Sequence, residues 1–517
     1  MLRSFANATQ QRSQKVTTVT VAAPTGGWNA RDALGAMDPL DAVTLQNWWP
    51  GTNSVLLRNG YTEHATGLPG QVDTLMVYSG ANTEMYAVSG GSIYDVTTAG
   101  AVGAAVVSGL SNSRWQYTNI STSAGTYIVA VNGTDPAQFY NGSTWEVEGS
   151  GAPYDWTGVN SEDCNNILLF KTRIWVVVND SLEVFYAPVN SIGGAFNSLQ
   201  MKGVMQKGGY IVAAMNWTLD AGYGMDDYIA FISNKGEVAV WQLTDPTTVS
   251  GISLIGVYTL GAPVGKRCFL KYGGDLLIIT QDGVVPMSGA LQSSRLDPRV
   301  SITNKIQFAM SQATSNHSDN FGWQLLYFPK ESQLYLNVPI NEGSLQQQYV
   351  QNNITKSWCN FTGWEANCWE ILNDHPYFGA NTTVNKAWEG QSDNNQIITA
   401  FGLQSFQTYG DISQKQCKMI RYHFLTVGSP NSYGNVNVDY DLSDTTAQIS
   451  ATSFTSGIWG ASTWDNAFWA FGLQALAEWQ TASYIGYTFA PILKVSTIGS
   501  EIQWVASDLV FEVGGVL

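Results

Sequence analysis

Short apolar strands separated by turns dominate the pattern of hydrophobic and polar positions along this chain. From about residue 70 to 390, an apolar strand, a turn with Gly or Asn, and a second strand with an aromatic residue recur. Copies of this unit start at Tyr86, Tyr127, Ile174, Tyr228, Leu276, Leu334 and Tyr377. Their spacings of 41 to 58 residues are typical of β-propeller blades. We therefore expect a degenerate β-propeller of about six blades over residues 70–400.

A propeller explains the repeat because one four-stranded blade cannot bury both of its faces alone. Radial packing of several blades buries a continuous ring of aromatic and β-branched side chains. The repeat carries no W-D dipeptide, no kelch glycine pair and no regular calcium motif. A sandwich or an irregular β-solenoid is also compatible with the same strand–turn pattern.

The regions on either side of the repeat have a different pattern of hydrophobic and polar positions. Residues 401–517 contain longer alternating strands, at 418–427, 435–442, 492–496 and 502–505, and predict a C-terminal platform domain resembling a β-sandwich. Residues 1–69 are interpreted as an N-terminal arm and entry segment. Within it, residues 31–47 are the best helix-like stretch, with Asp38 as a cap, Pro39 in the first turn, and Ala42, Val43 and Leu45 facing inward. The fold class is therefore mainly β.

Composition and charge exclude several functional classes. Charged residues make up only 12% of the 517 residues, against roughly 25% in a typical domain, and the hydrophobic share of 44% argues against disorder. The formal net charge of −16 leaves no basic footprint for gripping nucleic acid. No apolar run approaches the roughly 18 residues of a membrane-spanning helix, and the N-terminus lacks the apolar core of a secretory signal. We expect no stable membrane insertion.

Residues that commonly carry catalysis or bind metals are scattered. The four histidines have no metal-ligand spacing, and the odd number of cysteines, 5, at irregular intervals favours free buried thiols. The acidic pairs Glu162–Asp163 and Asp226–Asp227 could supply the two carboxylates of a glycosidase. Because neighbours on a strand point to opposite sides, solvated turn residues are the better interpretation. No phosphate-binding glycine loop occurs, and we expect no enzyme activity, no catalytic residues, no metal and no cofactor.

Two aromatic segments are candidate functional elements. Residues 138–145 partly match the S-x-D-x-G-x-T-W box of sialidase propellers, through Gly142, Thr144 and Trp145, and a hairpin turn at Asn141–Gly142 is the favoured interpretation. Residues 458–479 contain four tryptophans, a density that fits either a buried core or an exposed surface for subunit contact.

The segment from Pro24 to Tyr61 resembles the N-terminal segment of a family of tail proteins from short-tailed, podovirus-like bacteriophages. That family has a G-G-W/L-N-x-R-D stretch, then D-A-V-x-L-x-N-W-x-P, then V-x-L-R-x-G-Y. The residues of this chain that carry the resemblance, as a family signature expected to act in assembly, include Trp28, Asn29, Arg31, Asp32, Asn47, Trp48, Pro50, Arg58 and Tyr61. The chain end, residues 507–517, resembles that of the same family more weakly.

The resemblance implies a structural protein of the virion tail, the nozzle or tail tubular protein B-like component, made in the host cytoplasm. Such a protein would form a homohexameric ring around the DNA-exit channel and gate genome ejection. Its partners would be the head-to-tail adaptor and tail fibres or spikes, with DNA passing through without sequence-specific binding. The alternative is a phage tail propeller that binds or cleaves host-surface carbohydrate. A secreted bacterial binding module is a further possibility, for which a signal sequence would be expected.

Overall fold

The computed structural model describes residues 15–220, 225–291, 300–427, 430–449 and 474–513. It divides the chain into two units, Arg58–Gln396 and a second unit formed by Met1–Leu57 with Ile397–Leu517. These boundaries differ from the expected division at residues 69 and 400. The N-terminal segment is not a separate piece, because its described strands pair with strands from the C-terminal end of the chain.

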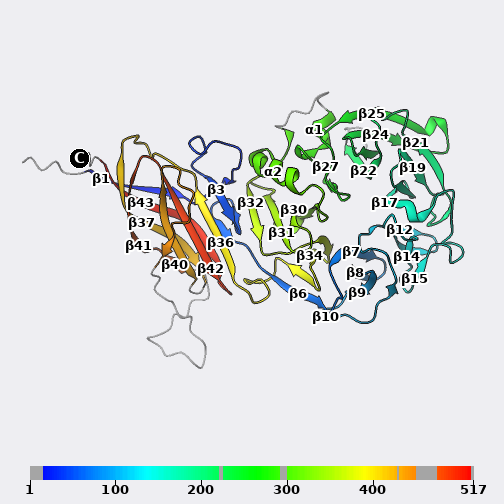
Figure 1. The fold of residues 1–517 in the computed structure, drawn as a ribbon, viewed down its shortest axis with the longest axis horizontal. Helices are drawn as coiled ribbons and strands as arrows, with labels where there is room; N and C mark the ends of the chain where they lie inside the picture. The colour runs from blue at the N-terminus through cyan, green and yellow to red at the C-terminus, as the bar shows by residue number, and fades with distance from the viewer. Residues whose placement is uncertain (1–14, 221–224, 292–299, 428–429, 450–473, 514–517) are drawn as a thin grey trace, which may run out of the picture. The chain divides into compact units, whose positions relative to one another are not determined.

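The unit Arg58–Gln396 is built from seven groups of hydrogen-bonded strands, which we call blades 1 to 7 in the order of their first strands (Figure 1). The first strands are β7 (Val72–Ser79), β12 (Gln116–Thr122), β17 (Cys164–Phe170), β22 (Ile211–Asp220), β26 (Phe269–Tyr272), β29 (Gln324–Phe328) and β33 (Cys368–Leu372). The second strands are β8 (Thr83–Ser89), β13 (Gly125–Val131), β18 (Arg173–Val178), β23 (Met225–Ser233), β27 (Asp275–Thr280), β30 (Gln333–Asn341) and β34 (His375–Gly379).

Each blade continues outward as an antiparallel meander. The third strands are β9 (Ser92–Asp95), β14 (Gln138–Tyr140), β19 (Glu183–Tyr186), β24 (Glu237–Leu243), β28 (Gly283–Pro286), β31 (Leu345–Asn352) and β35 (Val384–Ala387). Fourth strands follow in every blade except blade 5: β11 (Val107–Ser108), β15 (Trp145–Val147), β21 (Asn197–Gln200), β25 (Ile252–Thr259), β32 (Trp358–Thr362) and β6 (Tyr61–Thr66). Short additional strands are β10 (Gly100–Ala101), β16 (Trp156–Thr157) and β20 (Gly194–Ala195).

The blades close into a ring. Each first strand contacts the first strand of the next blade, and β33 of blade 7 contacts β7 of blade 1. The fold is therefore a β-propeller, as the repeat predicted, with seven blades in the described residues rather than about six. The sequence contains seven copies of the repeat unit. Each copy forms the second strand of one blade.

The last blade is completed by the first strand of the unit. Strand β6 pairs antiparallel with β35, with Ala65 opposite Val384. A buried apolar cluster then joins blade 7 to blade 1, with Cys368 and Val384 packed together with Val72 and Leu75. The ring is thus closed both by a strand ladder between the two ends of the unit and by burial of apolar surface.

Local predictions had mixed outcomes. The hairpin at Asn141–Gly142 is confirmed, since it connects β14 to β15. The helix expected over residues 31–47 is wrong: turns precede β3 (Asp41–Gln46), which pairs with β36 (Ile398–Gln404). Gly35 weakens a helix here, and the ladder to a distant strand overrides the remaining propensity. The helices of the propeller unit are α1 (Met287–Leu291) and α2 (Gln307–His317). In the described ranges, no helix has the length and apolar character needed to span a membrane.

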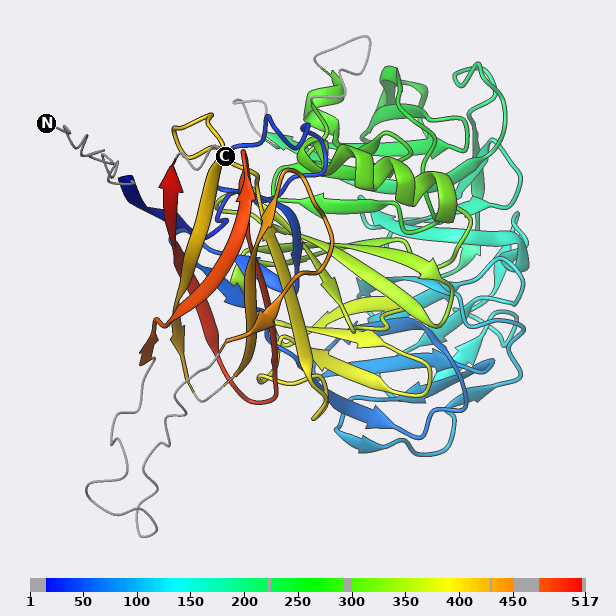
Figure 2. The same cartoon turned by 60° about the vertical axis from the view of Figure 1, so that its left-hand side comes forward.

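The second unit contains two sheets, as expected for a sandwich-like platform. One sheet contains β4 (Trp48–Pro50), β5 (Val55–Leu57), β43 (Ile502–Val513), β37 (Lys415–Thr426), β40 (Gln474–Leu476), β1 (Lys15–Ala22) and β41 (Trp479–Gly486). The other contains β3 and β36 with β42 (Phe489–Thr497), β38 (Asn431–Val438), β39 (Ala447–Gln448) and β2 (Gly27–Trp28). The long orange to red strands of this unit run side by side in Figure 2. The buried Tyr422 hydroxyl on β37 links the sheets, 2.7 Å from the carbonyl oxygens of Asn435 and Ile492.

Candidate functional site

The first half of the family signature folds around the side chain of Asn29, which is 1% exposed. Its amide nitrogen donates to Asp32 Oδ2 at 2.8 Å and to Asp41 Oδ2 at 2.7 Å. Its amide oxygen accepts from the backbone N–H groups of Arg31 and Asp32, both at 3.0 Å. Asn29 therefore shapes the turn that leads to β3, because a buried amide is stable only when both of its ends are paired. The Arg31 guanidinium pairs with Asp32 on the surface, and Trp28, on β2, is half-buried.

The second part of the signature enters the core of the platform unit. Asn47 adopts a left-handed φ of 56°, a conformation that Asn tolerates better than most residues, and its side chain donates to Thr399 O at 2.8 Å. The following Trp48 is fully buried, and its ring centroid lies 5.9 Å from that of Trp504. Pro50, at the end of β4, is also buried. These residues fasten the N-terminal segment to strands near the other end of the chain.

The last part of the signature lies in the propeller unit. Arg58 is fully buried and forms a two-pronged ion pair with Asp393, at 2.8 and 2.6 Å. The same guanidinium donates to Asn59 O and Thr362 O and lies 4.8 Å from the ring centre of Trp364. All of these partners lie within the same unit, so the charge is neutralised and its donors are used internally.

Gly60 and Tyr61 bring the chain from this ion pair into β6. A Cβ atom on Gly60 would overlap the carbonyl oxygen of Ser392, so only glycine fits at this close approach. The ring of Tyr61 packs edge-on against Phe378, with 5.2 Å between centroids. Burial raises the pKa of the Tyr61 hydroxyl above its ordinary value. The Arg–x–Gly–Tyr motif thus fixes the start of the strand that closes the ring.

The structure separates the signature residues into two internal networks, one in each unit. Apart from Arg31, whose guanidinium is exposed, these side chains are buried or half-buried. Their contacts explain why these residue types occur in this order, since they build turns, a core and an ion pair. The signature is therefore evidence about the fold, and its role in assembly remains a prediction.

Other candidates from the sequence do not come together as a site. Asp227 accepts hydrogen bonds from Thr218 and Lys171, and Asp163 accepts one from Asn160. The five cysteines are free and buried, as expected, and burial raises the pKa of the Cys268 thiol to about 12. Among the described residues no group of three or more His, Cys, Asp or Glu side chains could hold a metal ion. Most of the tryptophan-rich stretch 458–479 lies outside the described residues.

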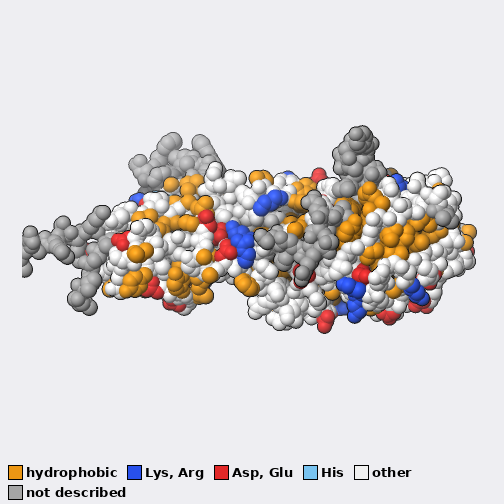
Figure 3. Space-filling model, turned by 90° about the horizontal axis from the view of Figure 1, so that it is seen from above, with side chains coloured by type: hydrophobic (Ala, Val, Ile, Leu, Met, Phe, Trp, Pro, Cys, Tyr) orange, Lys and Arg blue, Asp and Glu red, His pale blue; other side chains and the backbone are white. Residues whose placement is uncertain are grey.

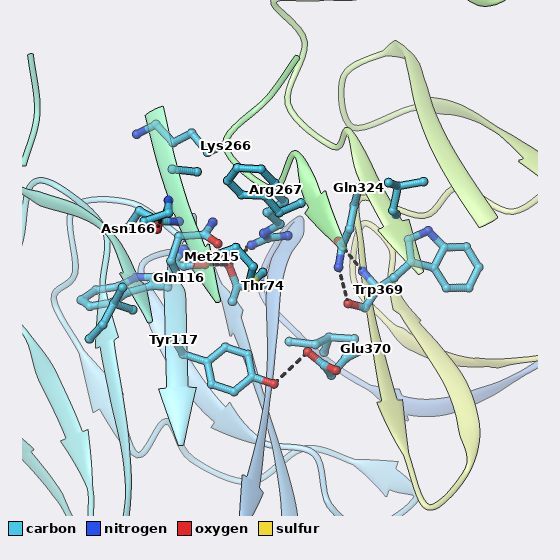
Figure 4. Close-up of a pocket in the computed structure, with 17 residues that line it drawn as sticks. Thr74, Gln116, Tyr117, Asn166, Met215, Lys266, Arg267, Gln324, Trp369 and Glu370 are labelled. Carbon is cyan, nitrogen blue, oxygen red and sulfur yellow. Dashed lines mark hydrogen bonds between the residues drawn. The ribbon is translucent and has the colours of Figure 1, made fainter. Parts of the chain in front are cut away.

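A cavity of about 190 Å³ lies at the centre of the propeller unit (Figure 4). The first strand of every blade contributes to its lining. One lining residue from each, in blade order, is Thr74, Gln116, Asn166, Ala214, Phe269, Gln324 and Glu370. The centre of a closed ring is where side chains from distant parts of the chain converge, so this cavity is the best candidate for a binding site in the propeller.

Two cations, Lys266 and Arg267, lie at the rim of this cavity just before β26. Lys266 is exposed, and its side chain extends away from that of Arg267 (Figure 4). Arg267 Nη2 donates to Asp73 O, Thr74 Oγ1 and Trp115 O, at 3.0, 2.9 and 3.1 Å. All three acceptors are uncharged, although the charge of Arg267 also acts on the carboxyls of Asp73 and Glu370. The side chain is therefore held in place while its positive charge is not neutralised by direct contact with a carboxylate.

Glu370 supplies the carboxylate among the lining residues. Its Oε2 accepts from the Tyr117 hydroxyl at 2.8 Å, and its Oε1 accepts from the Ile371 N–H at 3.0 Å. Burial raises the pKa of Glu370 above its ordinary value, against the opposing effect of these hydrogen bonds and of the Arg267 charge. Figure 4 shows Glu370 and Gln324 on one side of the cavity and Asn166 on the other.

Sequence reasoning missed this cavity. The available signal was the Lys266–Arg267 pair shortly before the repeat copy that starts at Leu276, in a chain with only 24 Lys and Arg residues. Identifying it requires knowing that the strand before each repeat copy is the innermost strand of a blade.

Comparisons with known proteins find no matching family model and no matching curated protein. Among solved structures, YCF48 from Cyanidioschyzon merolae matches with a TM-score of 0.38 and 11% identity, over 63% of this chain and 98% of that chain. The β-propeller domain of Myceliophteria thermophila Cps50 (Swd1) matches with a TM-score of 0.37 and 11% identity, over 63% and 98%. BBS1N in complex with ARL6DN matches with a TM-score of 0.30 and 14% identity. That match covers 42% of this chain and 64% of BBS1N, which is less than two thirds of its length. At these scores the likenesses carry no argument, and the propeller assignment depends on the strand order described above.

Proposed function

We propose that this chain is a structural component of a short phage tail, the nozzle, which forms a ring around the DNA-exit channel and gates genome ejection. The observation that carries the proposal is the resemblance of residues 24–61 to the N-terminal segment of that family. In this proposal the protein is a homohexamer in the virion tail. Its neighbours are the adaptor and the tail fibres or spikes, and it has no catalytic role.

The charge of the chain supports passage of DNA rather than binding of DNA. The formal net charge is −16, and a duplex carries one negative charge for about every 1.7 Å of its axis. On the face drawn in Figure 3, the Lys and Arg side chains of described residues lie singly or in small groups, without forming a continuous stripe. A weakly repulsive wall lets a polyanion slide, whereas a basic wall would hold it.

The first test is the size of the assembly. We expect light scattering after size-exclusion chromatography to give six times the 56.2 kDa of one chain, and negative-stain electron microscopy to show six-fold rings. A hole of about 20–25 Å would admit a B-form duplex. If the chain is monomeric alone and also after the adaptor protein is added, the nozzle proposal is wrong.

A second test concerns the channel. Purified rings should retain no duplex DNA in a gel-shift assay, even at low salt, where electrostatic binding is strongest. A complex that forms at low salt and dissociates as salt increases would indicate a basic channel and would contradict the proposed passage mechanism.

The alternative function, binding or cleavage of host-surface carbohydrate, is favoured by a second cavity of about 550 Å³ in the platform unit. Its lining includes Trp479, which is 39% exposed, together with Gln480 and Tyr484. An exposed indole beside amide and hydroxyl groups is a suitable surface for a sugar. Binding on a glycan array that Trp479→Ala abolishes would support this alternative, and release of reducing sugar would add cleavage. A negative result on capsule and lipopolysaccharide panels would count against it.

A further inference from the structure

One end of the platform unit carries exposed apolar side chains on three loops. We call this surface the loop patch, and its members are Ile412, Tyr440, Leu442 and Tyr487, which are 84%, 44%, 53% and 52% exposed. The first loop precedes β37, the second follows β38, and the third joins β41 to β42. A single exposed apolar residue is common on a protein surface, whereas several gathered together usually mark an interface.

Hydrogen bonds hold the three loops next to each other. The buried Lys415 donates from Nζ to Asp411 O at 2.5 Å and to Tyr487 O at 3.1 Å, which joins the first loop to the third. Asp439 Oδ1 accepts from the backbone N–H groups of Tyr487 and Thr488, at 2.8 and 2.9 Å, which joins the second loop to the third. These charge-assisted bonds make the loop patch one continuous surface.

Residues 1–14, which precede the described part of the chain, continue from this same end of the unit. Four paired residues lie in one row across the sheet, in the strand order β1, β43, β37 and β41: Lys15, Val513, Lys415 and Gly486. The chain before β1 therefore leaves the sheet where β43 ends and β37 begins (Figure 2). With strands about 4.8 Å apart, this row spans about 14 Å. Phe5 lies ten residues before β1 and can reach about 33 Å, so it can cover the loop patch.

The composition of residues 1–14 complements the loop patch. The segment reads M-L-R-S-F-A-N-A-T-Q-Q-R-S-Q, with two arginines and no acidic residue, in a chain of net charge −16. The loops 409–414 and 439–444 contain four aspartates and no Lys or Arg: Asp411, Asp439, Asp441 and Asp444. Lys494 pairs with one of these aspartates, Asp444. Opposite charges around an apolar contact favour this basic segment over the acidic remainder of the chain.

We propose that residues 1–14 dock on the loop patch of the same chain. The ring of Phe5 packs against Ile412 and Tyr487, and the two arginines of the segment lie beside the loop aspartates. Burial of apolar side chains from both surfaces supplies the driving force, and the charges fix the orientation. The docking is independent of the tail-nozzle proposal, because it takes place within one chain.

Disulfide trapping in the full-length protein tests this docking. In the variant Phe5→Cys with Tyr487→Cys, we expect mild oxidation to form a disulfide within one chain, because docking brings the two thiols within bonding distance. Mass spectrometry of non-reduced peptides detects it. The native cysteines are buried and therefore react slowly.

The matched control is Phe5→Cys with Val427→Cys. Val427 is also exposed, but it follows the other end of the 12-residue strand β37, about 40 Å away along the strand, which is beyond the reach of residue 5. Equal disulfide yields at positions 487 and 427, or no disulfide at position 487, would overturn the docking. Disulfides that join two chains would show that the loop patch binds a neighbouring copy and would exclude docking within one chain.

Charge reversal tests the electrostatic part of the proposal. Adding Arg3→Glu and Arg12→Glu should slow disulfide formation at position 487 at least about fivefold, because the loop aspartates then repel the segment, and high salt should reduce the difference. The matched control, Lys202→Glu with Lys207→Glu, makes the same change in net charge at exposed lysines of the propeller unit and should leave the rate unchanged. Equal slowing by the two pairs would show general repulsion and contradict the proposed charge pairing.

Discussion

Arg58 and Arg31 belong to the same N-terminal segment and both pair with an aspartate, but only Arg58 is buried. Replacing Arg58 with Met leaves Asp393 as an unpaired buried charge, so we expect a loss of about 3–5 kcal/mol in the free energy of unfolding. Arg31→Met, the matched control, removes an exposed pair and should cost at most about 1 kcal/mol. Urea unfolding followed by tryptophan fluorescence measures both.

The double variant Arg58→Met with Asp393→Leu sharpens this prediction. It removes both charges, so it should recover part of the stability lost in Arg58→Met. Equal losses of unfolding free energy for Arg58→Met and Arg31→Met would show that the buried ion pair contributes no more stability than the exposed one.

Acid should weaken the platform unit through Asp508. Burial raises the pKa of this carboxyl, but hydrogen bonds from Thr20, His423 and Arg421 outweigh burial and lower the pKa to about 2. Because this lies below the unfolded value of about 3.9, the stabilisation is present above pH 4 and is lost as the pH falls towards 2.

The expected size of this effect is roughly 2 kcal/mol. Asp508→Asn should therefore show a smaller loss of stability between pH 4.5 and about 2 than the wild type, measured as urea midpoints. Asp319→Asn, at an exposed carboxyl without a described hydrogen-bond partner, should keep the wild-type pH dependence. Parallel pH profiles for wild type and Asp508→Asn would contradict the prediction.

At the level of elements, ring closure depends on how β6 begins. Gly60→Ala places a Cβ atom against the backbone of Ser392, and we expect a loss of about 1–3 kcal/mol from the strain. Gly70→Ala is the matched control, because no atom lies within 4 Å of its added Cβ and its effect should stay within about 0.5 kcal/mol. Thermal unfolding of both variants measures these losses of stability. If Gly60→Ala is as stable as the wild type, strand β6 can shift to accept the added Cβ atom.

The blade strands could be predicted from the sequence because each second strand is a short buried run ending in a turn. The four long C-terminal strands could also be predicted, from their alternating hydrophobic and polar residues. The strand at Asp41–Gln46 could not be predicted, because its partner β36 lies more than 350 residues away and only pairing with it overrides the helix-like local pattern. The closing role of β6 was missed for the same reason, since its partner β35 belongs to the far end of the repeat.

The candidate cavity was harder to predict from the sequence than the strands. Most of its lining residues belong to seven strands spread over residues 74–370, and no local motif marks them. The signature residues stand out in the sequence, but their partners Asp393, Thr399 and Trp504 are visible only in the fold. Long-range partners of this kind leave no periodic trace in a single sequence.

For the whole molecule, the strand order predicts which fragment folds alone. Residues 58–396 contain all seven blades, including β6, and should unfold cooperatively in a circular-dichroism melt. Residues 70–400 lack β6, so β35 loses its neighbour and the joint between blades 7 and 1 loses Ala65 and Leu68. We expect this shorter fragment to melt at lower temperature or to aggregate through its open edge. Equal melting of the two fragments would contradict closure by β6.

The insertion of the propeller between two halves of the platform has a consequence for biosynthesis. Thr20 and Asp508 are hydrogen-bonded across 488 sequence positions, so the platform cannot be finished until the ribosome has made nearly the whole chain. The propeller can fold earlier, and the pairing of Tyr61 with Asp393 then holds the two ends of its segment together. This shortens the effective loop between the platform halves, where each doubling of loop length costs about 0.6 kcal/mol. Once folded, the propeller would thus bring the ends of the two platform segments near each other, so that their strands can pair after translation.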